Sequence, residues 1–256
     1  MNKLNTSIKF TLDKKEKRGI MIQFKLFGIS HLAFLVFECL MILLLCTAHK
    51  KIKENKKLTT FLRYTFAIIH IILEITYYVW ALYIEVPHMP ITRTLPLELC
   101  SISLYLTIFF LLFNNENLWR FSFPITIVGA SIACLLGTAD GYDFPHVRFL
   151  HFFLSHGLLI ITNLFGALVL DFKMGLKEYK KTLLSIYFIA FIVFFINKVI
   201  GANYMYLNWA PYPIEFIQDY FGNFFIIPLI IIMSALYYLP VYFLNFKIRK
   251  AVEIEN

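Results

Sequence analysis

Charged residues are scarce in this chain of 256 residues, because Asp, Glu, Lys and Arg together make up only 16% of it. About a quarter of the residues in a typical soluble domain are charged. Hydrophobic residues make up 59%, and the mean hydropathy is +0.70. This composition excludes an ordinary soluble domain and a disordered chain, and it indicates a protein that resides in a lipid bilayer.

Cysteine is also scarce, and four residues are too few for a secreted module held together by disulfides. Cys39, Cys46 and Cys134 lie inside apolar runs, so we expect them to be small buried hydrophobic side chains. Metal-ligand motifs with paired cysteines or with the spacing His-x-x-Glu-His are lacking. The sequence therefore predicts no metal and no cofactor.

The net charge is +8, but most Lys and Arg residues fall between the apolar runs. Positive charge placed in this way sets the orientation of a membrane protein and attracts anionic head groups. No basic motif interleaved with aromatics indicates nucleic-acid binding. We therefore expect membrane lipids as partners and no nucleic acid; the sequence indicates no oligomeric state.

Seven apolar runs approach the roughly 20 residues that a transmembrane helix needs. They lack the period-two alternation of barrel strands, which favours helices. The runs are approximately Leu26 to Cys46, Leu62 to Ile84, Leu97 to Phe113, Trp119 to Leu136, Phe149 to Leu170, Leu183 to Ile200 and Phe221 to Phe246. The sequence therefore predicts an all-α polytopic membrane protein with about seven transmembrane helices.

The chain divides into a basic amino-terminal tail (1–24), a membrane domain (25–249) and a short cytoplasmic tail (250–256). The segment from Tyr204 to Tyr220 is rich in proline and amphipathic aromatics, so we expect it to lie at the membrane interface.

Lys and Arg are concentrated in alternate connections between the runs, and short basic loops stay in the cytoplasm. With seven spans, this pattern predicts an external amino terminus and a cytoplasmic carboxyl terminus. The basic tail contradicts that orientation. Two explanations stay open: translation begins at Met21, or the tail is genuine.

Ionisable residues inside the bilayer cost about 2.5–3.5 kcal/mol each on insertion scales, so they need a partner, a cavity or a function. Three segments rich in such residues fall on the predicted outer side: LPLELCS (95–101), FPHVRFLHFFLSHG (144–157) and GANYMYL (201–207). Gly157 permits close approach of another helix.

A thiol beside an imidazole can form a nucleophilic thiolate, and Cys100 with His156 is such a pair. Glu98 or Glu74 could orient the imidazole. Arg148 or helix-terminal amides could hold an oxyanion or a phosphate. This inventory suits acyl transfer from a lipid ester through a thioester on Cys100.

Two other interpretations stay open. Buried acidic residues and histidines could line the pathway of a small-molecule or ion transporter or channel, although no internal repeat is visible. Alternatively, the protein is not catalytic, and its polar residues only join helices. In that case four of them could pair across the first two helices: His31, Glu38, His70 and Glu74.

The combination LPLELC, PHVRFLHFFLSHG and GANYMYL resembles the YwaF family of bacterial integral membrane proteins, over about Lys25 to Arg249. Relatives often carry LPLHLC, so a role specific to imidazole does not carry over to Glu98. The YwaF family is grouped with the eukaryotic transmembrane protein 164 family, which is similar to cysteine-dependent phospholipid acyltransferases or transacylases.

The resemblance implies that Cys100 is the nucleophile and His156 the general base in a bacterial cell membrane. We expect Arg148 to contact the head-group phosphate of a phospholipid or glycerolipid. The other expected substrate-binding residues are Glu98, His151, Ser155, Asn203 and Tyr204.

Overall fold

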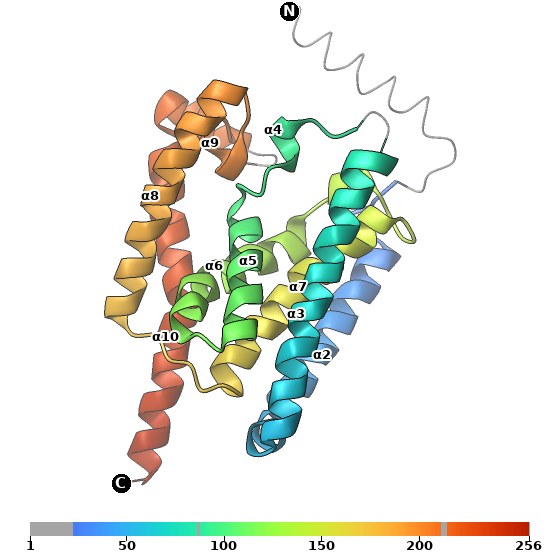
Figure 1. Ribbon diagram of the computed structural model, residues 1–256. Helices are drawn as coiled ribbons and strands as arrows, with labels where there is room; N and C mark the ends of the chain where they lie inside the picture. Colours follow the sequence, from blue (N-terminus) through green and yellow to red (C-terminus); the bar gives the residue numbers. More distant parts are fainter. Residues whose placement is uncertain (1–22, 86–87, 211–213, 256) are drawn as a thin grey trace, which may run out of the picture.

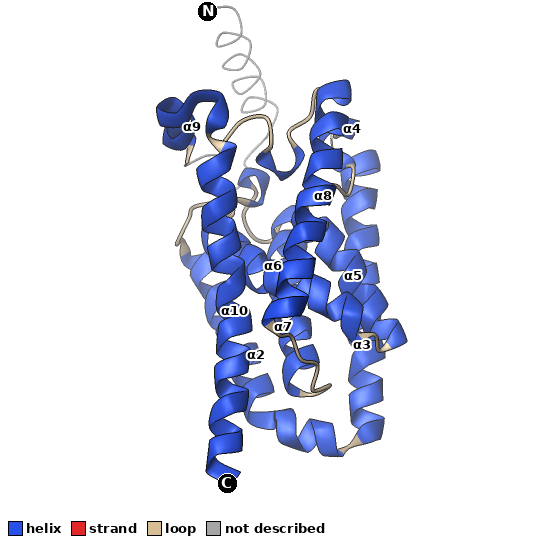
Figure 2. Ribbon diagram, turned by 90° about the vertical axis from the view of Figure 1, so that its left-hand side faces the viewer, coloured by secondary structure: helices blue, strands red, loops and turns tan. Residues whose placement is uncertain are grey.

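The computed structural model describes residues 23–85, 88–210 and 214–255, and within these residues the chain is helical without strands. Figure 2 shows helices joined by short loops. The predicted all-α membrane fold is confirmed.

Among the described residues, six helices are long and apolar enough to cross a membrane. They are α2 (Ile29–Glu54), α3 (Lys56–Val79, continued by a π-helical turn, Trp80–Ile84), α6 (Glu116–Leu136), α7 (Val147–Leu168), α8 (Leu176–Ile200) and α10 (Ile226–Glu255). A shorter apolar helix, α5 (Leu99–Phe113), lies between α3 and α6 in the chain. These seven helices match the seven predicted spans in order. Two short helices, α4 (Ile91–Thr94) and α9 (Glu215–Phe221), lie near one end of the bundle (Figure 1).

Several helices extend beyond the apolar runs that predicted them. α2 continues past Cys46 to Glu54, and α8 begins at Leu176 rather than at Leu183. The added turns are rich in Lys and Glu, which are good helix formers. Hydropathy therefore marks the part of each helix inside the hydrocarbon, not its full length.

α5 differs from the other spans because it has only 15 residues. At 1.5 Å per residue it extends about 22 Å, which is less than the roughly 30 Å of a hydrocarbon core. An extended segment, 95–98, leads into it. The amino-terminal end of α5 therefore lies inside the bundle and not at its surface.

Asn163 of α7 is the centre of a fully buried hydrogen-bond network. Its Nδ2 donates to Thr107 Oγ1 of α5 at 3.1 Å, and its Oδ1 accepts from Ser122 Oγ of α6 at 2.9 Å. Trp119 Nε1 of α6 also donates to the Asn163 carbonyl at 2.9 Å. One residue thereby joins three helices at fixed heights.

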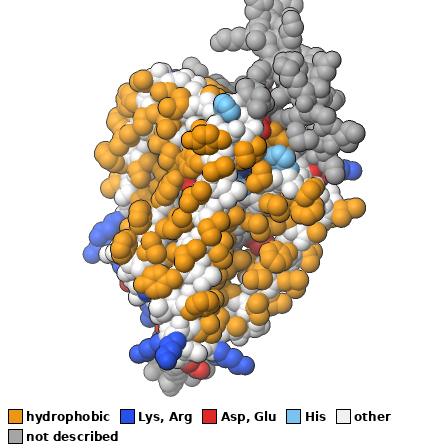
Figure 3. Space-filling view, turned by 45° about the vertical axis from the view of Figure 1, so that its right-hand side comes forward, with side chains coloured by type: hydrophobic (Ala, Val, Ile, Leu, Met, Phe, Trp, Pro, Cys, Tyr) orange, Lys and Arg blue, Asp and Glu red, His pale blue; other side chains and the backbone are white. Residues whose placement is uncertain are grey.

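Polar contacts join several basic connections at the opposite end of the bundle from α4. Lys53 pairs with Asp171, and Arg120 Nε donates to the Lys173 carbonyl at 2.7 Å. Figure 3 shows Lys and Arg side chains along this end, below a broad hydrophobic surface. The bundle thus has one basic end and an apolar belt between its ends.

Cys39 and Cys46 are exposed on α2, so the expectation that they are buried is wrong; only Cys134 is buried. α2 packs against the bundle along one side, and its other side carries exposed apolar residues. An apolar run in a membrane helix therefore does not distinguish a residue that faces protein from one that faces lipid.

Most of the predicted basic tail, including Met21, lies outside the described residues, as do residues 211–213 of the predicted interfacial segment. The described part of that segment contains a 3₁₀ turn, Tyr204–Tyr206, and the start of α9.

Replacement of Gly166 tests the packing around Asn163. A Cβ at Gly166 meets Trp119 Nε1 at 2.4 Å, so Gly166→Ala forces the indole away from its acceptor. Overpacking plus one lost hydrogen bond predicts a loss of roughly 2–4 kcal/mol in unfolding free energy. Reversible unfolding in bicelles measures this loss.

Gly129→Ala is the matched control, because its nearest neighbour in the bundle, Cys100 Sγ, lies at 3.8 Å. Equal stability of the two variants contradicts the packing described here.

Candidate functional site

Cys100 lies in the first turn of α5, where the extended residues 95–98 give way to helix. Glu98 is the N-cap residue, and its carbonyl accepts the first intrahelical hydrogen bond from Ile102 N at 3.0 Å. The preceding amides of a helix have no intrahelical acceptor, and the helix dipole favours negative charge beside them. The free amides at this position can therefore donate to an oxyanion.

The Cys100 thiol lies beside Gly129 of α6. It lies 3.8 Å from the position that a Cβ of Gly129 would occupy, and both residues keep accessible surface within the bundle. The Cys134 thiol and the Tyr237 phenol lie within electrostatic range of it. A glycine at position 129 thus leaves room for a group to approach the sulfur.

His156 of α7 has a defined proton position. Its Nδ1 lies 2.7 Å from the Phe152 carbonyl oxygen, which can only accept, so Nδ1 carries the hydrogen. The lone pair is then on Nε2, which hydrogen-bonds to none of the described residues. The ring is half-buried and packs on Phe152, with ring centroids 4.5 Å apart. His156 is therefore prepared to accept a proton through Nε2.

The bond between Thr107 and Asn163 sets the relative height of Cys100 and His156. α5 and α7 run in the same direction from the α4 end of the bundle (Figure 1). Cys100 lies seven residues before Thr107 in α5, and His156 lies seven residues before Asn163 in α7. Seven residues are about two helical turns, so each residue lies on the same face of its helix as its partner in the bond. From the helical repeat, the two residues are therefore expected at a similar depth, on the sides of α5 and α7 that meet at this bond, and they are called the facing pair below.

The pair is not in direct contact. Within the described part of the chain, no hydrogen bond joins the Cys100 thiol to His156. Figure 1 shows why: α5 and α7 are close at their lower ends and diverge toward α4.

Glu98 and Tyr204 brace the segment before α5. Glu98 Oε2 accepts from Met205 N at 2.9 Å. The Tyr204 hydroxyl donates to the Ile91 carbonyl at 2.6 Å and accepts from Leu95 N at 2.9 Å. Burial raises the pKa of the Tyr204 phenol, which keeps its proton available for Ile91. These two predicted substrate-binding residues bond to backbone and hold the start of α5 in place.

Asn203 organises its own loop. Its Oδ1 accepts from Asn208 N at 2.9 Å and from Trp209 N at 3.2 Å, while Nδ2 donates to the Trp209 carbonyl at 2.9 Å. Asn203 therefore shapes the connection after α8 and lies apart from the facing pair.

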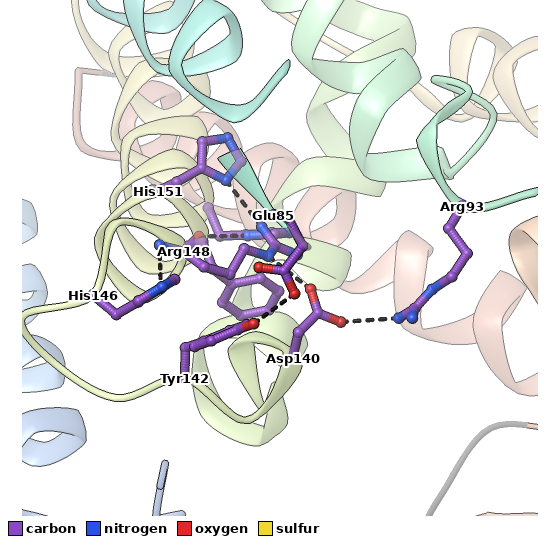
Figure 4. Close-up of polar contacts among 9 residues, drawn as sticks. Glu85, Arg93, Asp140, Tyr142, His146, Arg148 and His151 are labelled. Atoms are coloured by element: carbon purple, nitrogen blue, oxygen red, sulfur yellow. Dashed lines mark hydrogen bonds and ion pairs between the residues drawn. The ribbon is translucent and has the colours of Figure 1, made fainter. Parts of the chain in front are cut away.

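Arg148 is held by protein groups (Figure 4). Its Nε donates to Asp140 Oδ2 at 2.7 Å, and its Nη1 donates to His151 Nδ1 at 3.0 Å. Asp140 also pairs with Arg93 at 3.0 Å. The guanidinium lies over three aromatic rings: Tyr77, Trp80 and Phe152. This environment gives Arg148 a structural role at the α4 end of α7.

Among the described residues, no hydrogen bond joins the polar residues of the first two spans to one another, so the expected pairing across these two helices is not seen. His31 Nε2 donates to the Cys134 carbonyl at 2.7 Å, whereas His70 and Glu74 contact α7 and α5. Glu38 lies against Gly157, where a Cβ would come within 3.1 Å of the carboxylate. Gly157 thus permits the close approach predicted from the sequence.

Sequence reasoning missed Gly129 and Thr107. Gly129 leaves the space beside Cys100, and Thr107 fixes the height of α5. Gly129 could have been noticed in the sequence, because it is a glycine inside an apolar run. Thr107 has no such local feature.

Comparison with protein families matches residues 26–241 to the TMEM164 family. The chain belongs to the TMEM164 family. The match covers every helix from α2 to α9 and the first part of α10, so the facing pair lies within it. Comparison with curated proteins and with solved structures found no match.

Across the described ranges of this TMEM164-family protein, no three His, Cys, Asp or Glu side chains lie close enough to hold a metal ion.

The space beside Cys100 is testable with a bulky residue. Because protein interiors have little spare room, Gly129→Leu is expected to slow alkylation of Cys100 by an apolar maleimide roughly tenfold. Gly129→Ala is the control and keeps most of the reactivity, since its Cβ makes an ordinary contact at 3.8 Å. Mass spectrometry of the Cys100 peptide measures the rate. Unchanged alkylation of Gly129→Leu contradicts an approach past Gly129.

Proposed function

We propose that this TMEM164-family protein is a lipid acyltransferase or transacylase with Cys100 as nucleophile and His156 as general base. The observation that supports it most is the bond between Thr107 and Asn163, from which the helical repeat predicts a similar depth for the thiol and the imidazole. The resemblance seen in the sequence points to the same two residues.

The first half-reaction forms a thioester. His156 Nε2 takes the proton from the Cys100 thiol, and the sulfur attacks the carbonyl carbon of a lipid ester. As the tetrahedral intermediate collapses, the ester C–O bond breaks, and His156 returns the proton to the departing alkoxide. The acyl group is then on Cys100.

The second half-reaction reverses these roles. An acceptor hydroxyl gives its proton to His156 and attacks the thioester carbonyl. The C–S bond breaks, and the thiolate of Cys100 regains the proton from His156. The products are an acylated acceptor and the original enzyme, so protons and electrons balance over the cycle.

The first turn of α5 supplies the stabilising donors. The amides of Leu99, Cys100 and Ser101 precede the first intrahelical donor, Ile102 N, and their N–H groups are available to an oxyanion beside the sulfur. Tyr204 and Glu98 position this turn through their backbone contacts. Tyr204, Glu98 and Asn203 therefore contribute to substrate binding indirectly. Arg148 and His151 shape the entrance beside α7.

The proposed location is a bacterial cell membrane with a phospholipid or glycerolipid as acyl donor. The basic end of the bundle is assigned to the cytoplasm by the positive-inside rule. The described chain begins at the other end, so the amino terminus is external and the carboxyl terminus cytoplasmic (Figure 1). The reaction then takes place in the outer half of the bilayer.

Acyl capture tests the proposal. Purified protein is incubated with phosphatidylcholine that carries a fluorescent acyl chain, and thioesters are identified by release with neutral hydroxylamine. We expect label on Cys100, none on the Cys100→Ala variant, and at least about 10²-fold slower labelling of His156→Gln.

Cys134→Ala and Cys39→Ser are matched controls and retain labelling. Hydroxylamine-sensitive label that persists in Cys100→Ala contradicts the nucleophile assignment.

A further inference from the structure

Helices α3 and α7 share a face that carries polar side chains. The helices run in opposite directions and touch through polar or aromatic side chains at two heights. Tyr77 stacks on His151 with centroids 4.9 Å apart, and His70 Nε2 lies 3.3 Å from Thr162 Oγ1. These two contacts fix the register of the interface.

The residues between these contacts are also polar. On α7, Ser155 shares the face of His151 and Thr162, at positions i, i+4 and i+11. On α3, Glu74 lies one turn from His70 on the face that also carries Tyr77. The register sets Ser155 at the height of Glu74, whose carboxylate accepts from Tyr105 OH of α5 at 2.8 Å.

Several buried atoms on this face have no hydrogen-bond partner among the described residues. They are His151 Nε2, Ser155 Oγ and His70 Nδ1, and Ser103 Oγ of α5 adds a fourth. His70 and Ser103 are fully buried, and Ser155 is 6% exposed.

Each unpaired polar atom in a protein interior costs about 1–3 kcal/mol. Several such atoms along one interface are therefore not a stable dry arrangement, and ordered water is the usual partner of such groups. The Thr162 hydroxyl donates to the Leu158 carbonyl at 2.8 Å, so it accepts from His70 Nε2. His70 Nδ1 is then an acceptor without a donor, which a water molecule supplies.

We propose that α3, α5 and α7 enclose a file of bound water molecules that extends from His151 to His70. Its ligands are imidazole nitrogens, hydroxyls and the Glu74 carboxylate. The file ends at the His70–Thr162 contact, one residue from the buried Asn163 network, and it opens beside the partly exposed Arg148–Asp140 pair. Water thereby reaches the middle of the bundle from the α4 end.

The file passes close to the facing pair, because Ser155 directly precedes His156 in α7. If the proposed function holds, the same water protonates and hydrates that site, and water can act as an acyl acceptor. The file itself does not depend on catalysis, so its test uses no activity measurement.

X-ray radiolysis of the protein in nanodiscs tests the file, because hydroxyl radicals formed from bound water oxidise neighbouring side chains. His31 is a matched control: it is as fully buried as His70, but both ring nitrogens are paired, with Phe27 N at 3.0 Å and the Cys134 carbonyl at 2.7 Å. We expect His70 to be oxidised roughly tenfold faster than His31, since only His70 has an open site for water.

The variant Ser155→Leu fills the middle of the file and is expected to lower His70 oxidation at least severalfold, with His31 unchanged. Oxidation of His70 at the rate of His31 in the unsubstituted protein overturns the proposal, and this comparison needs no variant to fold. Equal oxidation of His70 and His31 would not affect the labelling of Cys100 in the acyl-capture experiment. The water file and the acyltransferase function are therefore tested separately.

Discussion

The hydrogen bonds of Asn163 are the constraint on which the rest of the structure depends. Water does not compete inside a bilayer, so a buried amide has to find its partners in other helices. Asn163 finds them in α5 and α6, and Trp119 closes the network by donating to its carbonyl. The heights of the three central helices follow from this one residue, and with them the facing positions of Cys100 and His156.

The same rule explains why residues that look catalytic in the sequence have structural partners. Arg148 cannot be left unpaired near hydrocarbon, and it is satisfied by Asp140, His151 and three aromatic faces. Tyr204 is likewise satisfied by backbone atoms before α5. Two exceptions remain among the described residues: His156 Nε2 has no hydrogen-bond partner, and the face between α3 and α7 carries buried polar atoms without one.

The number and order of the spans could be predicted from the sequence, because hydropathy reports the solvent around each segment. It does not report which side of a segment meets protein, and so Cys39 and Cys46 were expected inside and lie outside. The hydrogen-bond partners of the polar residues could not be predicted from the sequence either. Glu74 contacts Tyr105, a pairing that depends on helix register and leaves no local pattern. Cys100 and His156 were found because glycine, proline and polar residues interrupt apolar runs around them, while Thr107 resembles any threonine in a span.

The proposed function requires Cys100 of α5 and His156 of α7 to face each other. Cross-linking tests it most directly, with His156→Cys introduced where Cys39, Cys46 and Cys134 have been replaced. A short bifunctional thiol reagent should then join α5 to α7 through Cys100. Leu154→Cys is the control, because position 154 has nearly the same depth on an exposed side of α7. The reagent should not join this cysteine to Cys100. Cross-linking at position 154 but not at 156 would contradict the account.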